Sequence, residues 1–117
     1  MADHVELTRA DGDPVCRARV ARSFAQRLLG LMGTAGLEPG TGVLFPATSS
    51  VHTHFMRYPI DVVFLDADVG VVALRHSLAP WRFAAAKGAR SVLELPAGTC
   101  ERVGIAVGDR LVERPTA

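Results

Sequence analysis

Two histidines lie two residues apart in the segment VHTHFMRYPIDVVFLD, residues 51–66. Side chains repeat on one face of a strand every second residue, so we expect His52, His54 and Met56 to share a face. Neighbours on that face lie about 6.7 Å apart, so two imidazoles could converge on one ion, whereas Met56 lies about 13 Å from His52. Imidazole suits copper and zinc, so His52 and His54 are candidate transition-metal ligands, with hydrogen-bonded surface histidines as the alternative. We predict no other cofactor.

Two carboxylates are the candidates for acid/base chemistry. Asp61 alternates onto the same strand face as Val63 and Leu65, so we expect it to point partly inward. A buried carboxylate needs partners: it could anchor a polar ligand, act as a base, accept bonds from the preceding turn or pair with Arg57. Glu94 could form an acid/base couple with Asp61 if the two carboxyls meet. The alternatives for Glu94 are a salt bridge and a solvent-facing position.

A third candidate site combines aromatic and polar residues. Tyr58 and Trp81 could stack against a sugar or a protein partner if they are exposed. We group them with Met56 and Asp61 as candidate ligand-binding residues. Phe83 is expected to pack in the core.

The chain shows no motif of an established catalytic class. There is no GxGxxG or GxxxxGK loop for phosphate and no Gly-x-Ser-x-Gly elbow of a serine hydrolase. The two cysteines, Cys16 and Cys100, form no Cys-x-x-Cys motif, so we interpret each as a small buried hydrophobe. Whether the protein is an enzyme stays open, and the pattern leans against it.

Composition narrows the class of protein. The chain has 117 residues, 49% of them hydrophobic, which suits one domain over residues 1–117 with short frayed ends. Its 13 basic and 12 acidic residues give a net charge of +1, which argues against nucleic acid as a partner. The polar amino terminus does not resemble a signal peptide, and the longest apolar run is far shorter than the roughly 20 residues of a membrane span. We therefore expect a soluble, cytoplasmic monomer.

Short strands separated by Gly and Pro turns dominate the pattern. We expect strands at 5–8, 15–21, 43–45, 49–56, 60–66, 71–77, 91–95, 105–107 and 110–112, the last two joined as a hairpin by Gly108 and Asp109. One helix is expected at 23–33, where Ser23 and Gln26 form a capping box, and one helical turn at 99–104. This indicates a mainly β barrel or jelly-roll-like sandwich with one helix. The runner-up is an α+β domain with a second helix near 81–87.

Five sequence blocks in this order resemble a known family. They are RLLGLM at 27–32, GVLF at 42–45, MRYPIDVVF at 56–64 with Asp66, VLELPAG at 92–98, and GI at 104–105 with GD at 108–109. Over about residues 15–112 the chain resembles the bacterial and archaeal family called domain of unknown function 192. The resemblance implies a small β-rich barrel or jelly-roll and no activity. Many relatives look exported or membrane-anchored, from which the polar start here departs.

From these observations we predict a non-catalytic binding or accessory β-domain for a small polar ligand, a glycan or a protein partner. The alternatives are a metal-binding protein that uses His52 and His54, and an acid/base enzyme that uses Asp61 and Glu94.

Overall fold

The computed structural model describes residues 4–21, 38–54 and 56–115. The predicted helix at 23–33 lies outside these residues. The described elements, in chain order, are β1 (His4–Arg9), β2 (Pro14–Val20), β3 (Thr41–Pro46), β4 (Ser50–His52), β5 (Ile60–Leu65), β6 (Val71–Leu78), β7 (Phe83–Ala85), β8 (Ser91–Pro96), α2 (Thr99–Val103) and β9 (Leu111–Pro115).

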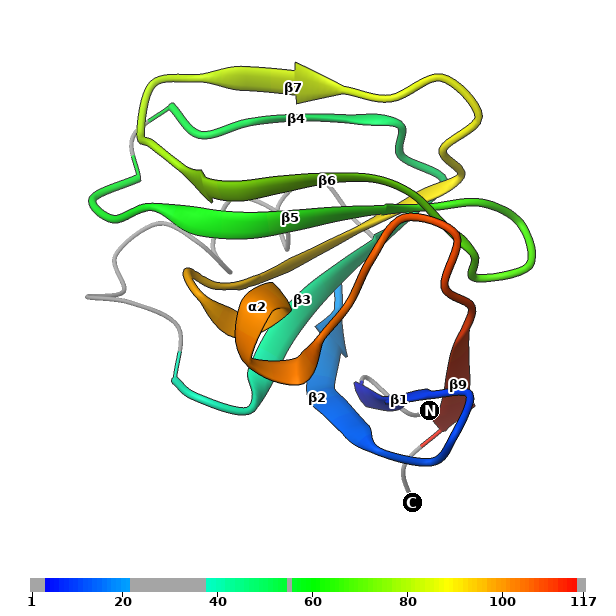
Figure 1. Cartoon of the computed structure of the whole chain (residues 1–117). Coiled ribbons are helices and arrows are strands. Elements are labelled where there is room, and N and C mark those ends of the chain that lie inside the picture. Colours follow the sequence, from blue (N-terminus) through cyan, green and yellow to red (C-terminus); the bar gives the residue numbers. More distant parts are fainter. Residues whose placement is uncertain (1–3, 22–37, 55, 116–117) are drawn as a thin grey trace.

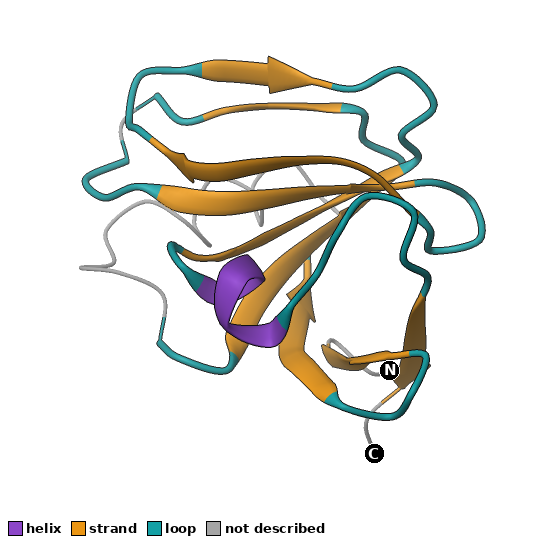
Figure 2. Ribbon diagram, viewed as in Figure 1, coloured by secondary structure: helices purple, strands orange, loops and turns teal. Residues whose placement is uncertain are grey.

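Seven of these strands form one sheet in the order β6-β5-β8-β3-β2-β1-β9, and β4 and β7 form a separate two-stranded ribbon. Every pair in the large sheet is antiparallel except β2 with β3. The large sheet curls into a half-barrel, and the ribbon runs alongside β5 and β6 (Figure 1). The prediction of a mainly β fold is confirmed (Figure 2).

The two edges of the curled sheet meet at one end. Gly70, just before β6, forms an antiparallel bridge with Arg110, just before β9. Three further backbone bonds hold this junction: Val71 N–H to Asp109 O at 2.8 Å, Gly108 N–H to Val71 O at 2.9 Å, and Leu111 N–H to Val69 O at 3.0 Å. The chain between α2 and β9 therefore ties the β6 edge to the β9 edge.

The sheet has a hydrophobic core on each face. The inner core lies within the curl and includes Leu7, Ala18, Leu95 and Leu111. The outer core lies beneath the ribbon and includes Val51, Met56, Phe64 and Val92. All six residues of β5 are buried, because β5 pairs with β6 on one side and β8 on the other and is covered on both faces. The prediction of a central strand here is confirmed.

Two sequence predictions of local structure are wrong. The second helix near 81–87 is instead β7, whose residues pair with β4. The hairpin of 105–107 with 110–112 does not form, because β9 pairs with β1, so residues 113–115 belong to the sheet and are not a frayed end. The helical turn at 99–104 is confirmed as α2. Within the described ranges, no helix is long and apolar enough to cross a membrane.

Candidate functional site

The β4–β7 ribbon turns one face inward and one outward. Val51 pairs with Ala84, and both are buried in the outer core. His52 pairs with Phe83, the next residue pair along, and both are exposed. Alternation along a strand explains the split, since successive side chains point to opposite faces. The prediction that Phe83 packs in the core is wrong, because its side chain, 67% exposed, lies on the outward face.

Thr53 anchors the chain that follows the ribbon. This residue is fully buried, and its Oγ1 donates to Ala79 O at 2.6 Å and accepts from Arg82 N–H at 2.8 Å. Its backbone N–H donates to Arg82 O at 2.8 Å, and its carbonyl accepts from Trp81 N–H at 3.0 Å. These four bonds define the backbone positions of both His54 and Trp81.

Trp81 is held in an unusual conformation. Its φ is +63°, in the left-handed region that bulky residues rarely adopt. Its side chain is 56% exposed. Strained backbone persists only where surrounding contacts over-determine it, and such positions concentrate at functional sites.

Four ring-bearing side chains gather on this side of the molecule, and we call them the aromatic surface: His52, His54, Trp81 and Phe83. The rings of His52 and His54 have centroids 5.0 Å apart and are tilted by 56°. The rings of His54 and Trp81 lie 5.3 Å apart and nearly perpendicular, at 84°. The structure therefore brings both predicted metal-ligand histidines next to one predicted ligand-binding residue.

The structure does not bring the other predicted ligand-binding residues to this surface. Met56 is 5% exposed and packs in the outer core, with Tyr58 half-buried against that core. The expected common face of His52, His54 and Met56 is wrong, because β4 ends at His52.

Asp61 lies on the opposite, inner face of the sheet and is fully buried. Its Oδ1 accepts from Ser77 N–H and its Oδ2 accepts from Cys100 N–H, both at 2.9 Å. The residue before α2 is Gly98, which has no side chain to cap the helix. Asp61, from the distant strand β5, instead accepts the Cys100 N–H, one of the first-turn donors that have no partner within the helix. The donors to Asp61 therefore do not come from the preceding turn, which was one of the alternatives for this carboxylate.

Both cysteines are free and buried. Burial raises the pKa of the Cys16 thiol to about 12. Burial, reinforced by the charge and hydrogen bond of Asp61, raises the pKa of the Cys100 thiol to about 12 as well. Because the thiolate is the nucleophile, neither thiol is activated for catalysis.

Glu94 is 3% exposed, so the expectation of a solvent-facing position is wrong. It pairs across the sheet with Val62 and Val43, which belong to the outer core, while Asp61 pairs with Leu95. Residues adjacent in a strand point to opposite faces, so Asp61 and Glu94 are separated by the sheet. The predicted acid/base couple is therefore wrong. Burial raises the pKa of Glu94 to about 8.

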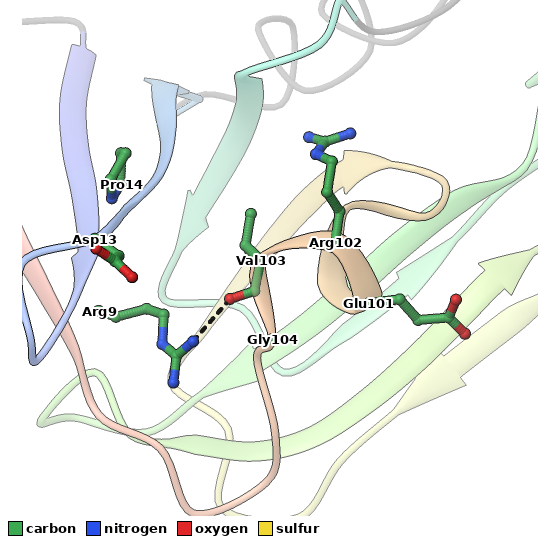
Figure 3. A pocket seen from close by; sticks show the side chains of 7 residues that line it. All are labelled: Arg9, Asp13, Pro14, Glu101, Arg102, Val103 and Gly104. Atoms are coloured by element: carbon green, nitrogen blue, oxygen red, sulfur yellow. Dashed lines mark hydrogen bonds between the residues drawn. The ribbon is translucent and has the colours of Figure 1, made fainter.

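A polar pocket of about 420 Å³ lies at the carboxyl end of α2. The Arg9 guanidinium donates to Val103 O at 2.9 Å, while Glu101 and Arg102 extend away from Arg9 (Figure 3). Its lining residues are Arg9, Asp13, Pro14, Glu101, Arg102, Val103 and Gly104. The sequence analysis missed this pocket, because its residues come from segments about ninety positions apart and share no motif.

Residues 6–112 match the model of the domain of unknown function 192 family (DUF192), described as an uncharacterized family. The chain belongs to this family. The prediction made from the five sequence blocks is confirmed.

Other DUF192 relatives carry the family name UPF0127. A UPF0127 protein of Pyrococcus furiosus is 40% identical over 100 residues, which cover 80% of this chain and 83% of the relative. One of Thermococcus sibiricus is 34% identical over 100 residues, which cover 81% of this chain but 64% of that longer protein.

Two solved structures share this DUF192 fold. A protein of Sinorhizobium meliloti, described as a candidate transcription regulator, superposes with a TM-score of 0.81 at 26% identity over 97% of this chain and 94% of its own. A protein of unknown function from Novosphingobium aromaticivorans gives a TM-score of 0.79 at 28% identity over 93% of this chain and 83% of its own.

Proposed function

We propose that this protein is a non-catalytic binding domain and that the aromatic surface is its binding site. The observation that carries the proposal is the placement of Trp81. Trp81 is 56% exposed, and its strained backbone donates a hydrogen bond to the buried Thr53. A site built on such anchored positions is pre-organised, so little ordering entropy opposes binding.

The chemistry of the surface favours a sugar ring as the ligand. Trp81 and Phe83 offer exposed apolar rings, and His52 and His54 lie beside them with nitrogen atoms that can donate or accept hydrogen bonds. A pyranose is apolar on its ring face and carries hydroxyls at its rim, so it complements both halves of this surface. Small-molecule binding sites commonly combine aromatic side chains with a few groups that form hydrogen bonds.

A binding role suits the buried polar groups better than catalysis. Asp61 is occupied by two backbone donors, and Glu94 lies on the other face of the sheet. We take residues 1–117 as one domain that binds as a monomer in the cytoplasm. The near-neutral charge favours a sugar over nucleic acid, although one structural neighbour is described as a candidate transcription regulator.

The test is an amide NMR titration of the full chain with a panel of mono- and oligosaccharides. We expect saturable shifts at residues 50–54 and 81–85. Trp81→Ala and Phe83→Ala should each weaken binding by about fivefold, since an aromatic contact contributes about 1 kcal/mol. Val107→Ala is the matched control, because Val107 is 61% exposed and lies outside the aromatic surface. A well-dispersed spectrum that no sugar shifts would overturn the proposal.

A further inference from the structure

We infer that His52 and His54 together bind a divalent first-row transition ion of the kind that prefers imidazole, with Zn²⁺ and Cu²⁺ as the probes. The inference does not depend on the proposed sugar site, because it rests on the geometry of the two imidazoles alone.

The separation of the two rings fits a shared ion. Their centroids lie 5.0 Å apart, and their planes are tilted by 56°. An ion bound by two imidazoles at about 2.0–2.1 Å per bond with a tetrahedral angle places the ring centroids about 5 Å apart. The separation of the two ring centroids is therefore the separation that a shared ion requires.

The backbone that carries both rings is fixed before any ion binds. His52 is the last residue of β4 and pairs with Phe83. Thr53, between the two histidines, makes the hydrogen bonds to the segment 79–82 described above. His54 packs its ring edge-to-face with Trp81. Ligands held on rigid elements retain the geometry that a metal site requires.

The two histidines would leave coordination positions of the bound ion open. Among the described residues, no group of three or more His, Cys, Asp or Glu side chains is placed to share an ion. Both histidines are exposed, so water or an external ligand would complete the coordination. Sites that keep open positions serve binding or catalysis, whereas structural zinc sites are filled by four protein ligands. The buried cysteines would not compete, because their thiols stay protonated.

The test is a calorimetric and NMR titration of the chelator-treated full chain with Zn²⁺ and with Cu²⁺. We expect one saturable ion, seen as imidazole shifts at His52 and His54 with Zn²⁺ and as paramagnetic broadening of the same signals with Cu²⁺. Mutating a residue that only supports a metal ligand costs roughly 10–100-fold in metal affinity. His52→Ala and His54→Ala remove a ligand itself, so each should weaken metal binding by at least that factor. His76→Ala is the control, because His76 is an exposed histidine on β6 and should leave the affinity unchanged. Folding of each variant is checked by its dispersed amide spectrum.

Two results would overturn the inference: no saturable shift at either imidazole, or equal affinity in wild type, His52→Ala and His54→Ala. Phe83→Ala separates this inference from the sugar proposal. That variant should weaken sugar binding and leave metal affinity unchanged, since Phe83 offers the ion no ligand atom. Metal binding without sugar binding would reject only the proposed function, and the reverse would reject only the metal site.

Discussion

At the scale of single residues, Glu94 is a carboxyl group placed within an apolar layer of the outer core. Burial raises its pKa from 4.5 to about 8, so the folded protein keeps a proton that the unfolded chain releases above about pH 4.5. Stability should therefore fall as the pH rises from about 4.5 to about 8 and level off above that, by an amount on the order of 5 kcal/mol at most.

Glu94→Gln tests this linkage, because an amide keeps the shape of the side chain but does not titrate. We expect the variant to unfold at nearly the same urea concentration at pH 5 and pH 8.5, whereas the wild type loses stability over that range. Glu101→Gln, at an exposed position on α2, should behave like the wild type. A wild type with the same midpoint at both pH values would contradict the prediction.

Asp61 is also a buried carboxyl group, but backbone hydrogen bonds compensate for its burial. Its two oxygens accept backbone bonds at 2.9 Å from Ser77 and Cys100. Asp61→Asn replaces one acceptor by a donor that faces a backbone N–H, so we expect a loss of about 2–4 kcal/mol in the free energy of unfolding. Hydrogen exchange should also accelerate at the amides of Ser77 and Cys100.

The control for this prediction is Asp68→Asn, because the Asp68 side chain is exposed. It should change stability by less than about 0.5 kcal/mol. If Asp61→Asn is as stable as that control, the carboxylate does not hold α2 to β6.

At the scale of elements, the carboxyl end of α2 depends on a glycine and an arginine. Gly104 has a φ of +76°, and a Cβ on it would lie 2.9 Å from Arg9 Nη1. Arg9 donates to the Val103 carbonyl at that helix end, where a cation also suits the helix dipole. Gly104→Ala should therefore destabilise the protein in two ways: alanine is strained in the left-handed conformation, and its Cβ displaces the Arg9 guanidinium from the Val103 carbonyl.

Gly88→Ala provides the matched comparison, because Gly88 has a φ of +87° with nothing within 4 Å of its Cβ position. Gly88→Ala should cost about 1–2 kcal/mol for the backbone alone. Gly104→Ala should cost about 1 kcal/mol more for the displaced arginine bond. In an Arg9→Ala background the two glycine variants should cost the same, and a persisting difference in urea unfolding would refute the role of Arg9.

At the scale of the whole molecule, β9 and the junction before it join the two edges of the curled sheet. Leu111 is 2% exposed, packs in the inner core and donates its N–H to Val69 O at the junction. Leu111→Ala should destabilise the protein by about 2–5 kcal/mol, as truncation of a buried leucine does. Val107→Ala, on the same connection but exposed, should cost less than about 0.5 kcal/mol.

The measurement is again urea unfolding, followed by both tryptophan fluorescence and circular dichroism. Trp81 bonds to Thr53 next to the ribbon, whereas circular dichroism reports the strands of the whole sheet, so coincident transitions would show that the ribbon and the sheet unfold together. A Leu111→Ala variant with wild-type stability would mean that the closure at β9 contributes nothing to the fold.

Local sequence pattern was enough to predict the strands whose alternation repeats along the chain. Alternation in β2 buries Cys16, Ala18 and Val20 as predicted, and the apolar run of β5 is central as predicted. Family membership also followed from sequence blocks. These properties depend on neighbours within a few residues, which local periodicity reports directly.

Contacts between residues far apart in the chain could not be predicted in this way, because they depend on how the strands pair. The alternation of side chains predicted that Asp61 points inward. It could not predict the donors Ser77 and Cys100, which are 16 and 39 residues away. It could not place Glu94 on the opposite face from Asp61, because that depends on the register of β5 with β8. Trp81 lies beside His54 because Thr53 bonds to a segment 26–29 residues further along the chain. No local sequence pattern encodes that contact.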